Sequence, residues 1–90
     1  MNRTPANEIK TQDIITLHGD PRTGPWVMSR VVKEVTPDGA GTRLVLEDGQ
    51  SWTTKPNESF LVSDTFDQAD LVEARLWEIF DEKFPINATR

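Results

Sequence analysis

The first two-thirds of the chain shows the alternating apolar and polar spacing that is typical of β-strands. A short β-favouring run at residues 13–18 ends at Gly19. A longer run rich in β-branched residues covers 26–36, and its neighbours Val31 and Val32 point to opposite faces. This second pattern indicates a strand that bends or is covered on both sides.

The middle of the chain predicts a β-hairpin. Residues 42–47 alternate cleanly between apolar and polar side chains, and the return run at residues 50–54 carries Trp52. The pair Asp48-Gly49 joins the two runs. Asp-Gly between strand-like runs is a strong hairpin signal, because both residues tolerate positive φ in a tight turn.

A short last strand is predicted at residues 60–62, which makes five strands. Before it comes a turn segment, Lys55-Pro56-Asn57-Glu58-Ser59, which is predicted to form one turn of 3₁₀ helix. The order of long loop, turn, tight hairpin, 3₁₀-like turn and last strand over residues 12–62 resembles the SH3-like small barrels, which include SH3, Tudor and KOW-type domains. The resemblance implies a five-stranded barrel over residues 11–62. The chain has no tyrosine, so we do not expect the usual recognition of polyproline.

After Val62 the apolar spacing changes from two to about 3.6, which predicts an acidic amphipathic helix at residues 63–85. Thr65 and Gln68 form a capping box at its start, and Pro85 ends it. One broad stripe carries the apolar residues of this helix, Phe66, Ala69, Val72, Leu76, Trp77, Ile79, Phe80 and Phe84. The predicted fold is therefore mainly β with one C-terminal helix in the same domain.

Neither end of the chain shows helical or strand periodicity. Residues 1–10 are polar around Ile9 and predict a flexible tail, and residues 86–90 predict a second one. No segment is apolar enough for a secretory signal or a membrane span. We therefore expect a cytoplasmic protein that does not bind membranes.

Composition and charge limit the kinds of binding site that these 90 residues can form. Without cysteine and with a single histidine, the sequence offers no Cys/His cluster for a metal, and we expect no cofactor. The net charge is −5, and residues 63–90 hold 7 acidic against 3 basic side chains. This balance argues against a domain held to nucleic acid by bulk electrostatics, which needs a concentrated basic surface.

His18 is the one candidate general base, and no serine lies in a nucleophile-elbow pattern. We therefore expect no catalytic residue and no enzyme. The loop that follows is a candidate binding loop, because its prolines would present Asp20, Arg22 and Trp26 at little entropic cost. The alternative is an ordinary loop made of turn residues.

Three aromatic residues, Trp26, Trp52 and Phe60, form a candidate platform for a base or a methylated amine. The alternative is that they belong to the core, since a small barrel can hardly spare a tryptophan. The basic residues that would flank such a platform are Arg22, Arg30, Lys33, Arg43 and Lys55.

The far end of the helix carries the large apolar residues Trp77, Phe80 and Phe84. Either they pack on the chain's own barrel, or they bind a protein partner or a second copy of the chain. The leading hypothesis is a non-enzymatic protein-interaction or regulatory module whose helix is the partner or dimer surface. The alternative is a KOW or Tudor-like domain that binds nucleic acid through Trp26, Trp52 and nearby basic side chains.

Overall fold

Six strands and one α-helix make up residues 3–83, the part of the chain that the structure, a computed structural model, describes. In chain order the elements are β1 (Arg3–Pro5), the 3₁₀ turn η1 (Ala6–Glu8), β2 (Ile14–His18), β3 (Val27–Asp38), β4 (Gly41–Leu46), β5 (Ser51–Thr53), β6 (Ser59–Ser63) and α1 (Phe66–Lys83). The strands form one antiparallel sheet in the order β1-β6-β2-β3-β4-β5.

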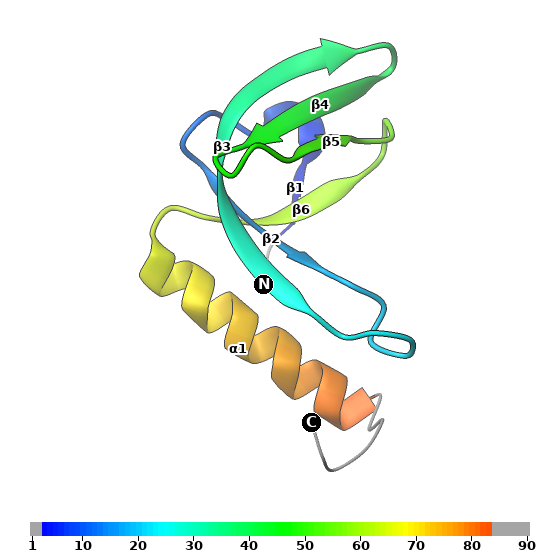
Figure 1. Cartoon of the computed structure of the whole chain (residues 1–90), viewed down its shortest axis with the longest axis vertical. Helices are drawn as coiled ribbons and strands as arrows, with labels where there is room; N and C mark the ends of the chain where they lie inside the picture. The colour runs from blue at the N-terminus through cyan, green and yellow to red at the C-terminus, as the bar shows by residue number, and fades with distance from the viewer. Residues whose placement is uncertain (1–2, 84–90) are drawn as a thin grey trace.

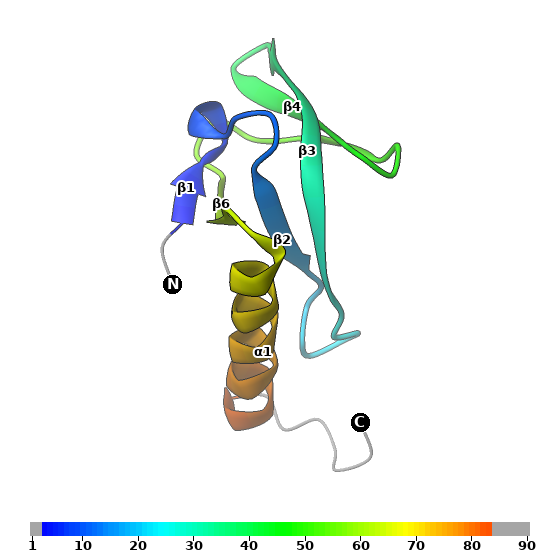
Figure 2. The ribbon, with the colours of Figure 1, turned by 90° about the vertical axis from the view of Figure 1, so that its left-hand side faces the viewer.

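The prediction of a mainly β fold with one C-terminal helix is confirmed, but the prediction of a closed five-stranded barrel is wrong. The sheet has six strands, and its outer strands β1 and β5 do not pair with each other. The sheet is nevertheless curled, so that β1 and β4 lie across from each other and its inner face is enclosed between them (Figures 1 and 2).

The long strand β3 produces this curl. Residues 27–31 pair with β2, whereas residues 32–38 pair with β4. The register shifts between Val32 and Glu34, which marks a β-bulge, and such bulges bend the strand and increase its twist. Val32 is fully buried and Val31 half-buried, as expected for neighbours on opposite faces. The predicted bend is thus confirmed (Figure 1).

The inner face of the curled sheet encloses the larger apolar core. Its buried members come from β2, β3, β4 and β6 and from the N-terminal segment, and they are Ala6, Ile9, Ile15, Leu17, Val32, Leu44, Leu46 and Phe60. The strict alternation predicted for residues 42–47 is confirmed, because Leu44 and Leu46 are fully buried while Arg43 is exposed.

The prediction of a flexible tail at residues 1–10 is wrong for the described residues 3–10. β1 pairs with β6, and Ala6 and Ile9 are only 3% and 4% exposed in the inner core. The sequence pattern does not reveal this strand or the burial of Ala6 and Ile9, because two apolar residues in a polar stretch show no periodicity. In addition, β1 gains its stability from a strand far along the chain, which no local pattern reveals.

The predicted hairpin is confirmed, with a different turn. β4 pairs with β5 in a register that sets Leu44 opposite Trp52. The N–H of Gly49 donates to the C=O of Leu46 at 3.0 Å, and the N–H of Leu46 donates to the C=O of Gln50 at 2.8 Å. Gly49 has φ +91°, so the loop contains three residues and ends on a glycine in the left-handed region.

Helix α1 begins where the capping box was predicted. The hydroxyl of Thr65 accepts the N–H of Gln68 at 3.2 Å, and the side-chain oxygen of Gln68 accepts the N–H of Asp64 at 2.9 Å. The helix is described as far as Lys83. The predicted stop at Pro85 and the predicted tail at 86–90 lie outside the described residues.

Helix α1 packs on the outer face of β2, β3 and β6, opposite the inner core (Figure 2). A second apolar cluster joins helix and sheet, made of the buried Leu61, Leu76 and Phe80 with the partly buried Val27, Val72 and Trp77. Ala69 is fully buried too, but Phe66, which belongs to the same predicted apolar stripe, is 50% exposed. Phe66 is the first residue of the helix, and the buried part of the stripe starts about one turn later, at Ala69.

A polar contact inside this interface fixes how the helix sits on the sheet. Thr16 and Ser29 lie opposite each other on β2 and β3, and their hydroxyl oxygens are 2.9 Å apart. The Ser29 hydroxyl donates to the Glu73 carboxylate at 2.6 Å. Both hydroxyl residues are buried, so sliding the helix would leave buried polar groups without partners, which is costly.

Changing Gly49 to valine should lower the free energy of unfolding by about 1 kcal/mol or more, because a β-branched residue resists positive φ. Gly24 is a matched control, since its φ is ordinary and no atom lies within 4 Å of where a Cβ would stand. Urea unfolding of Gly49→Val and Gly24→Val checks this. Equal stability of the two variants would contradict the turn described above.

Changing Phe80 to alanine should lower the free energy of unfolding by about 3 kcal/mol or more, because it empties a site in the helix–sheet cluster. The control is Leu71→Ala on the same helix, where the side chain is 73% exposed and the change should stay within about 0.5 kcal/mol. Thermal melts measure both. Similar melting temperatures would mean that α1 does not dock on the sheet in solution.

Candidate functional site

The sheet leaves an open seam between its two outer strands. Between β5 and the β1–β6 side lies a hollow of about 240 Å³. Trp52 and Thr54 line it from the β5 side, Arg3 and Ser59 line it from β1 and β6, and Phe60 lies among its walls. We call this hollow the seam. It marks the place where a closed barrel would have paired its last strands.

Trp52 is the main aromatic residue of the seam. It lies opposite Leu44, and directly opposed residues of two strands share one face, so its side chain projects on the inner side of the sheet. The indole is nevertheless 36% exposed, whereas Phe60 beside it is 9% exposed. Of the two, Phe60 belongs to the core and Trp52 covers the open side of the core.

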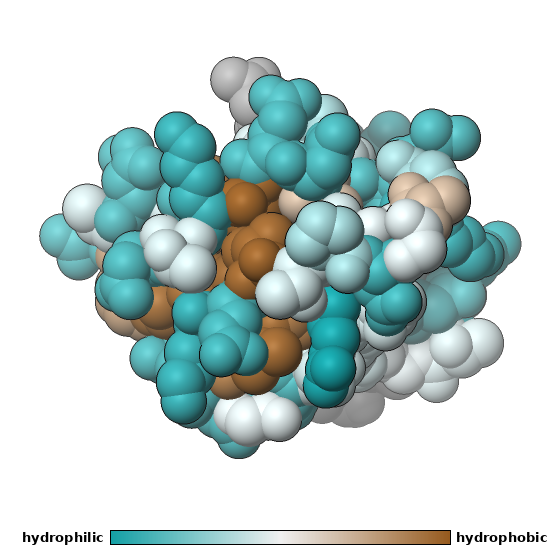
Figure 3. Space-filling model, turned by 90° about the horizontal axis from the view of Figure 1, so that it is seen from above, coloured by the Kyte–Doolittle hydropathy of each residue, from teal (hydrophilic) through white to brown (hydrophobic). Residues whose placement is uncertain are grey.

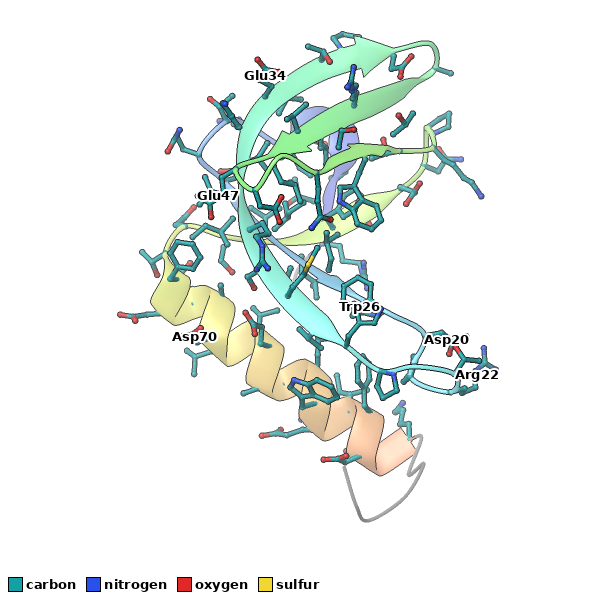
Figure 4. All side chains as sticks on the ribbon, in the orientation of Figure 1. Asp20, Arg22, Trp26, Glu34, Glu47 and Asp70 are labelled. Atoms are coloured by element: carbon teal, nitrogen blue, oxygen red, sulfur yellow. The ribbon has the colours of Figure 1, made fainter. Side chains whose placement is uncertain are left out.

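Trp26 directly precedes β3 and does not line the seam. It is 41% exposed and lies across Gly19, where an added Cβ would overlap its indole ring. Figure 4 shows it beside the sheet, separate from Asp20 and Arg22. The structure therefore brings two members of the predicted aromatic platform, Trp52 and Phe60, to one hollow and leaves the third apart.

Asp20 and Arg22 pair with each other at the tip of the loop between β2 and β3 (Figure 4). The Asp20 carboxylate accepts the backbone N–H of Arg22 at 2.8 Å and lies 3.4 Å from its guanidinium Nε. The backbone hydrogen bond from Arg22, and then its charge, hold the pKa of Asp20 below the ordinary 3.8. The pair thus stabilises the turn and offers little unbalanced charge to a ligand.

A second hollow, of about 350 Å³, lies between this loop and helix α1. Its apolar walls come from the helix–sheet cluster and include Leu61, Leu76 and Phe80. Arg3 and His18 line both this hollow and the seam, so the two hollows adjoin. The sequence missed Arg3 because the N-terminal segment showed no pattern.

His18 is engaged by its neighbours in the structure. Its Nδ1 lies 3.0 Å from the C=O of Gly19, a geometry in which Nδ1 carries the proton and donates. The ring packs edge-on against Phe80, with centroids 5.6 Å apart. Within residues 3–83 no three His, Cys, Asp or Glu side chains gather in a way that would hold a metal ion.

The basic residues predicted to flank the tryptophans divide into two groups. Arg43 lies opposite Thr53, next to Trp52, and Lys55 follows two residues later, whereas Arg22 and Arg30 face aspartates. Arg30 pairs with Asp48 at 3.0 Å. The pKa of Asp48 lies below 3.8, mainly because the carboxylate accepts the backbone N–H of Gln50, and also because of Arg30. The acidic residues Glu34, Glu47 and Asp70 line the side of the molecule opposite the loop that carries Asp20 and Arg22 (Figure 4).

The helix residues predicted to bind a partner differ in how deeply they are buried. Phe80 is 5% exposed and packs against the chain's own sheet, so it needs no external cover. Trp77 is half-buried and meets Phe80 edge-on, with ring centroids 5.6 Å apart. Phe84 lies outside the described residues. Of the two alternatives left open for this end of the helix, Phe80 follows the first, because it packs on the chain's own sheet.

The end of the molecule that carries the turn between β3 and β4 shows a band of apolar residues framed by polar ones (Figure 3). A hollow of about 200 Å³ lies between this hairpin and the residues Asn7 and Pro56. Val35 and Ala40 contribute its apolar part, and no charged side chain lines it. Its polar side chains are those of Asn7 and Thr42.

No protein-family model, curated protein or solved structure matches the chain. The helix that the structure describes lacks the apolar length needed to cross a membrane.

Proposed function

We propose that the chain is a non-enzymatic protein-interaction module and that its binding site is the seam. One observation carries this proposal: Trp52 is 36% exposed beside a hollow that the side chains of the described residues 3–83 do not fill. Tryptophan is enriched among the residues that contribute most to protein–protein binding, because it buries a large rigid surface in one contact. The tight hairpin of β4 and β5 supports an SH3-like relationship. The predicted 3₁₀ turn before β6 does not, because an ordinary turn stands there and the 3₁₀ turn is η1.

The seam is a better candidate than the helix that the sequence suggested. In the described part of α1 the apolar stripe is buried at Ala69, Leu76 and Phe80, and Phe66 at the start of the helix is its exposed member. The β5 residues Ser51, Trp52 and Thr53, in contrast, are all exposed.

The dimensions of the seam favour a peptide over a small molecule. Its volume of about 240 Å³ is below the roughly 300–1,000 Å³ that small-molecule pockets usually have. The hollow can take one or two side chains of a segment that lies along β5. Its polar atoms come from both sides, with Arg3 and Glu58 among the lining residues.

The alternative, a nucleic-acid-binding domain, is favoured only by the exposure of Trp26 and Trp52. Stacking of bases on such residues needs basic side chains nearby to neutralise phosphates. Two of the candidate arginines, Arg22 and Arg30, instead face aspartates. The net charge of −5 opposes phosphate binding as well.

The test uses peptides selected from a random library against the full chain and then synthesised. Their affinity, measured by fluorescence anisotropy, should fall at least about tenfold for Trp52→Ala. It should not change for Leu71→Ala, which removes an exposed apolar side chain on α1. Melting curves of both variants control for folding.

Selected peptides that bind Trp52→Ala as tightly as the unaltered chain would contradict this proposal, and so would a selection that enriches none. Random single-stranded oligonucleotides form the second arm. Submicromolar binding of these at physiological salt, lost on changing Trp26 or Trp52 to alanine, would replace the proposal with the nucleic-acid alternative.

A further inference from the structure

We infer that the partner segment binds as an additional β-strand on the free edge of β5, and that it is acidic where it passes Thr53 and Lys55. This inference rests on the proposed function, because it specifies how the seam holds its ligand. It assigns the binding to main-chain hydrogen bonds of β5 together with one pocket for side chains.

The hydrogen-bond alternation of the hairpin leaves β5 with a free edge. The N–H of Leu46 donates to the C=O of Gln50, and the N–H of Thr54 donates to the C=O of Thr42 at 2.8 Å. In an antiparallel ladder hydrogen-bonded pairs alternate with non-bonded ones, so Trp52 turns its N–H and C=O toward β4. Ser51 and Thr53 consequently turn theirs toward the open edge.

The opposite edge of the sheet, β1, is blocked. The N–H of Ala6 donates to the C=O of Glu58 at 3.0 Å, which makes this a bonded pair. By the same alternation, Arg3 and Pro5 direct their backbone toward the open edge of β1. Pro5 has no N–H to donate, and proline is a common means of protecting an edge strand. Of the two edges, β5 is therefore the one that can accept a strand.

An added strand would also use the seam. Its residue opposite Trp52 would project on the inner side of the sheet, as Trp52 and Leu44 do. That side opens into the hollow between β5 and β6. Main-chain pairing would thus supply affinity and the hollow would supply selectivity for the side chain that enters it.

The charges around β5 favour an acidic segment. Arg43 lies directly opposite Thr53 on β4, Lys55 follows two residues later, and Arg3 lines the seam. The acidic residue on this side is Glu58, whose carboxylate already accepts the N–H of Lys55 at 2.7 Å. These side chains form a local excess of positive charge on a chain whose net charge is −5.

The experiment compares Thr53→Pro with Thr53→Ala, using the library-selected peptides as the probe. Proline removes the outward N–H and leaves the bonds of Trp52 and Thr54 to β4 intact, whereas alanine removes only the side chain. We expect Thr53→Pro to weaken binding about tenfold or more and Thr53→Ala to leave it nearly unchanged. Circular dichroism verifies that both variants fold.

A second measurement keeps the inference testable if Thr53→Pro does not fold. N-methylation of single backbone amides along a selected peptide should weaken binding at alternate positions, because only every second amide of a strand faces its neighbour. Replacing the glutamates of the peptide by glutamine should weaken binding to the unaltered chain, and the loss should be smaller for Lys55→Gln.

Equal affinity of Thr53→Pro and Thr53→Ala, or loss at consecutive N-methylated amides, would overturn strand addition. If that peptide still depends on Trp52, the proposed function stands. Peptides that bind without dependence on Trp52 overturn both. A chain that dimerises by itself, with the dimer lost in Thr53→Pro, would show that a second copy and not an acidic partner segment occupies this edge.

Discussion

The bend in β3 is the constraint on which the rest of this structure depends. One strand of twelve residues, Val27–Asp38, serves two sheet halves, because it pairs with β2 through its first part and with β4 through its second. The bulge between Val32 and Glu34 turns these halves toward each other. The inner core forms between them, with the fully buried Val32 at the turning point.

The two faces of the curled sheet are used for different purposes. The inner face is filled by side chains of the strands and of the N-terminal segment, and the outer face is covered by α1 through Leu76 and Phe80. The contact from Ser29 to Glu73 fixes the helix in place. The seam at β5 remains uncovered, since residues 3–83 contribute neither a further strand nor a helix there.

Local patterns predicted most of the elements, and long-range contacts explain the failures. Alternation and turn residues located β2 to β6, and the spacing after Val62 located α1. β1 and the burial of Ile9 depend on pairing with β6 and on the inner core, which no local pattern encodes. Closure of the sheet is equally non-local. Trp52 was recognised as a candidate site residue, but its partner across the hollow, Arg3, was not.

The most direct test of this account is amide hydrogen exchange on the free chain, followed by NMR. An open β5 edge predicts alternation: the amides of Trp52 and Thr54, directed at β4, should exchange slowly, and those of Ser51 and Thr53 should exchange like unprotected amides. Slow exchange of all four amides at low protein concentration would contradict it, because the edge would then be covered by the chain itself.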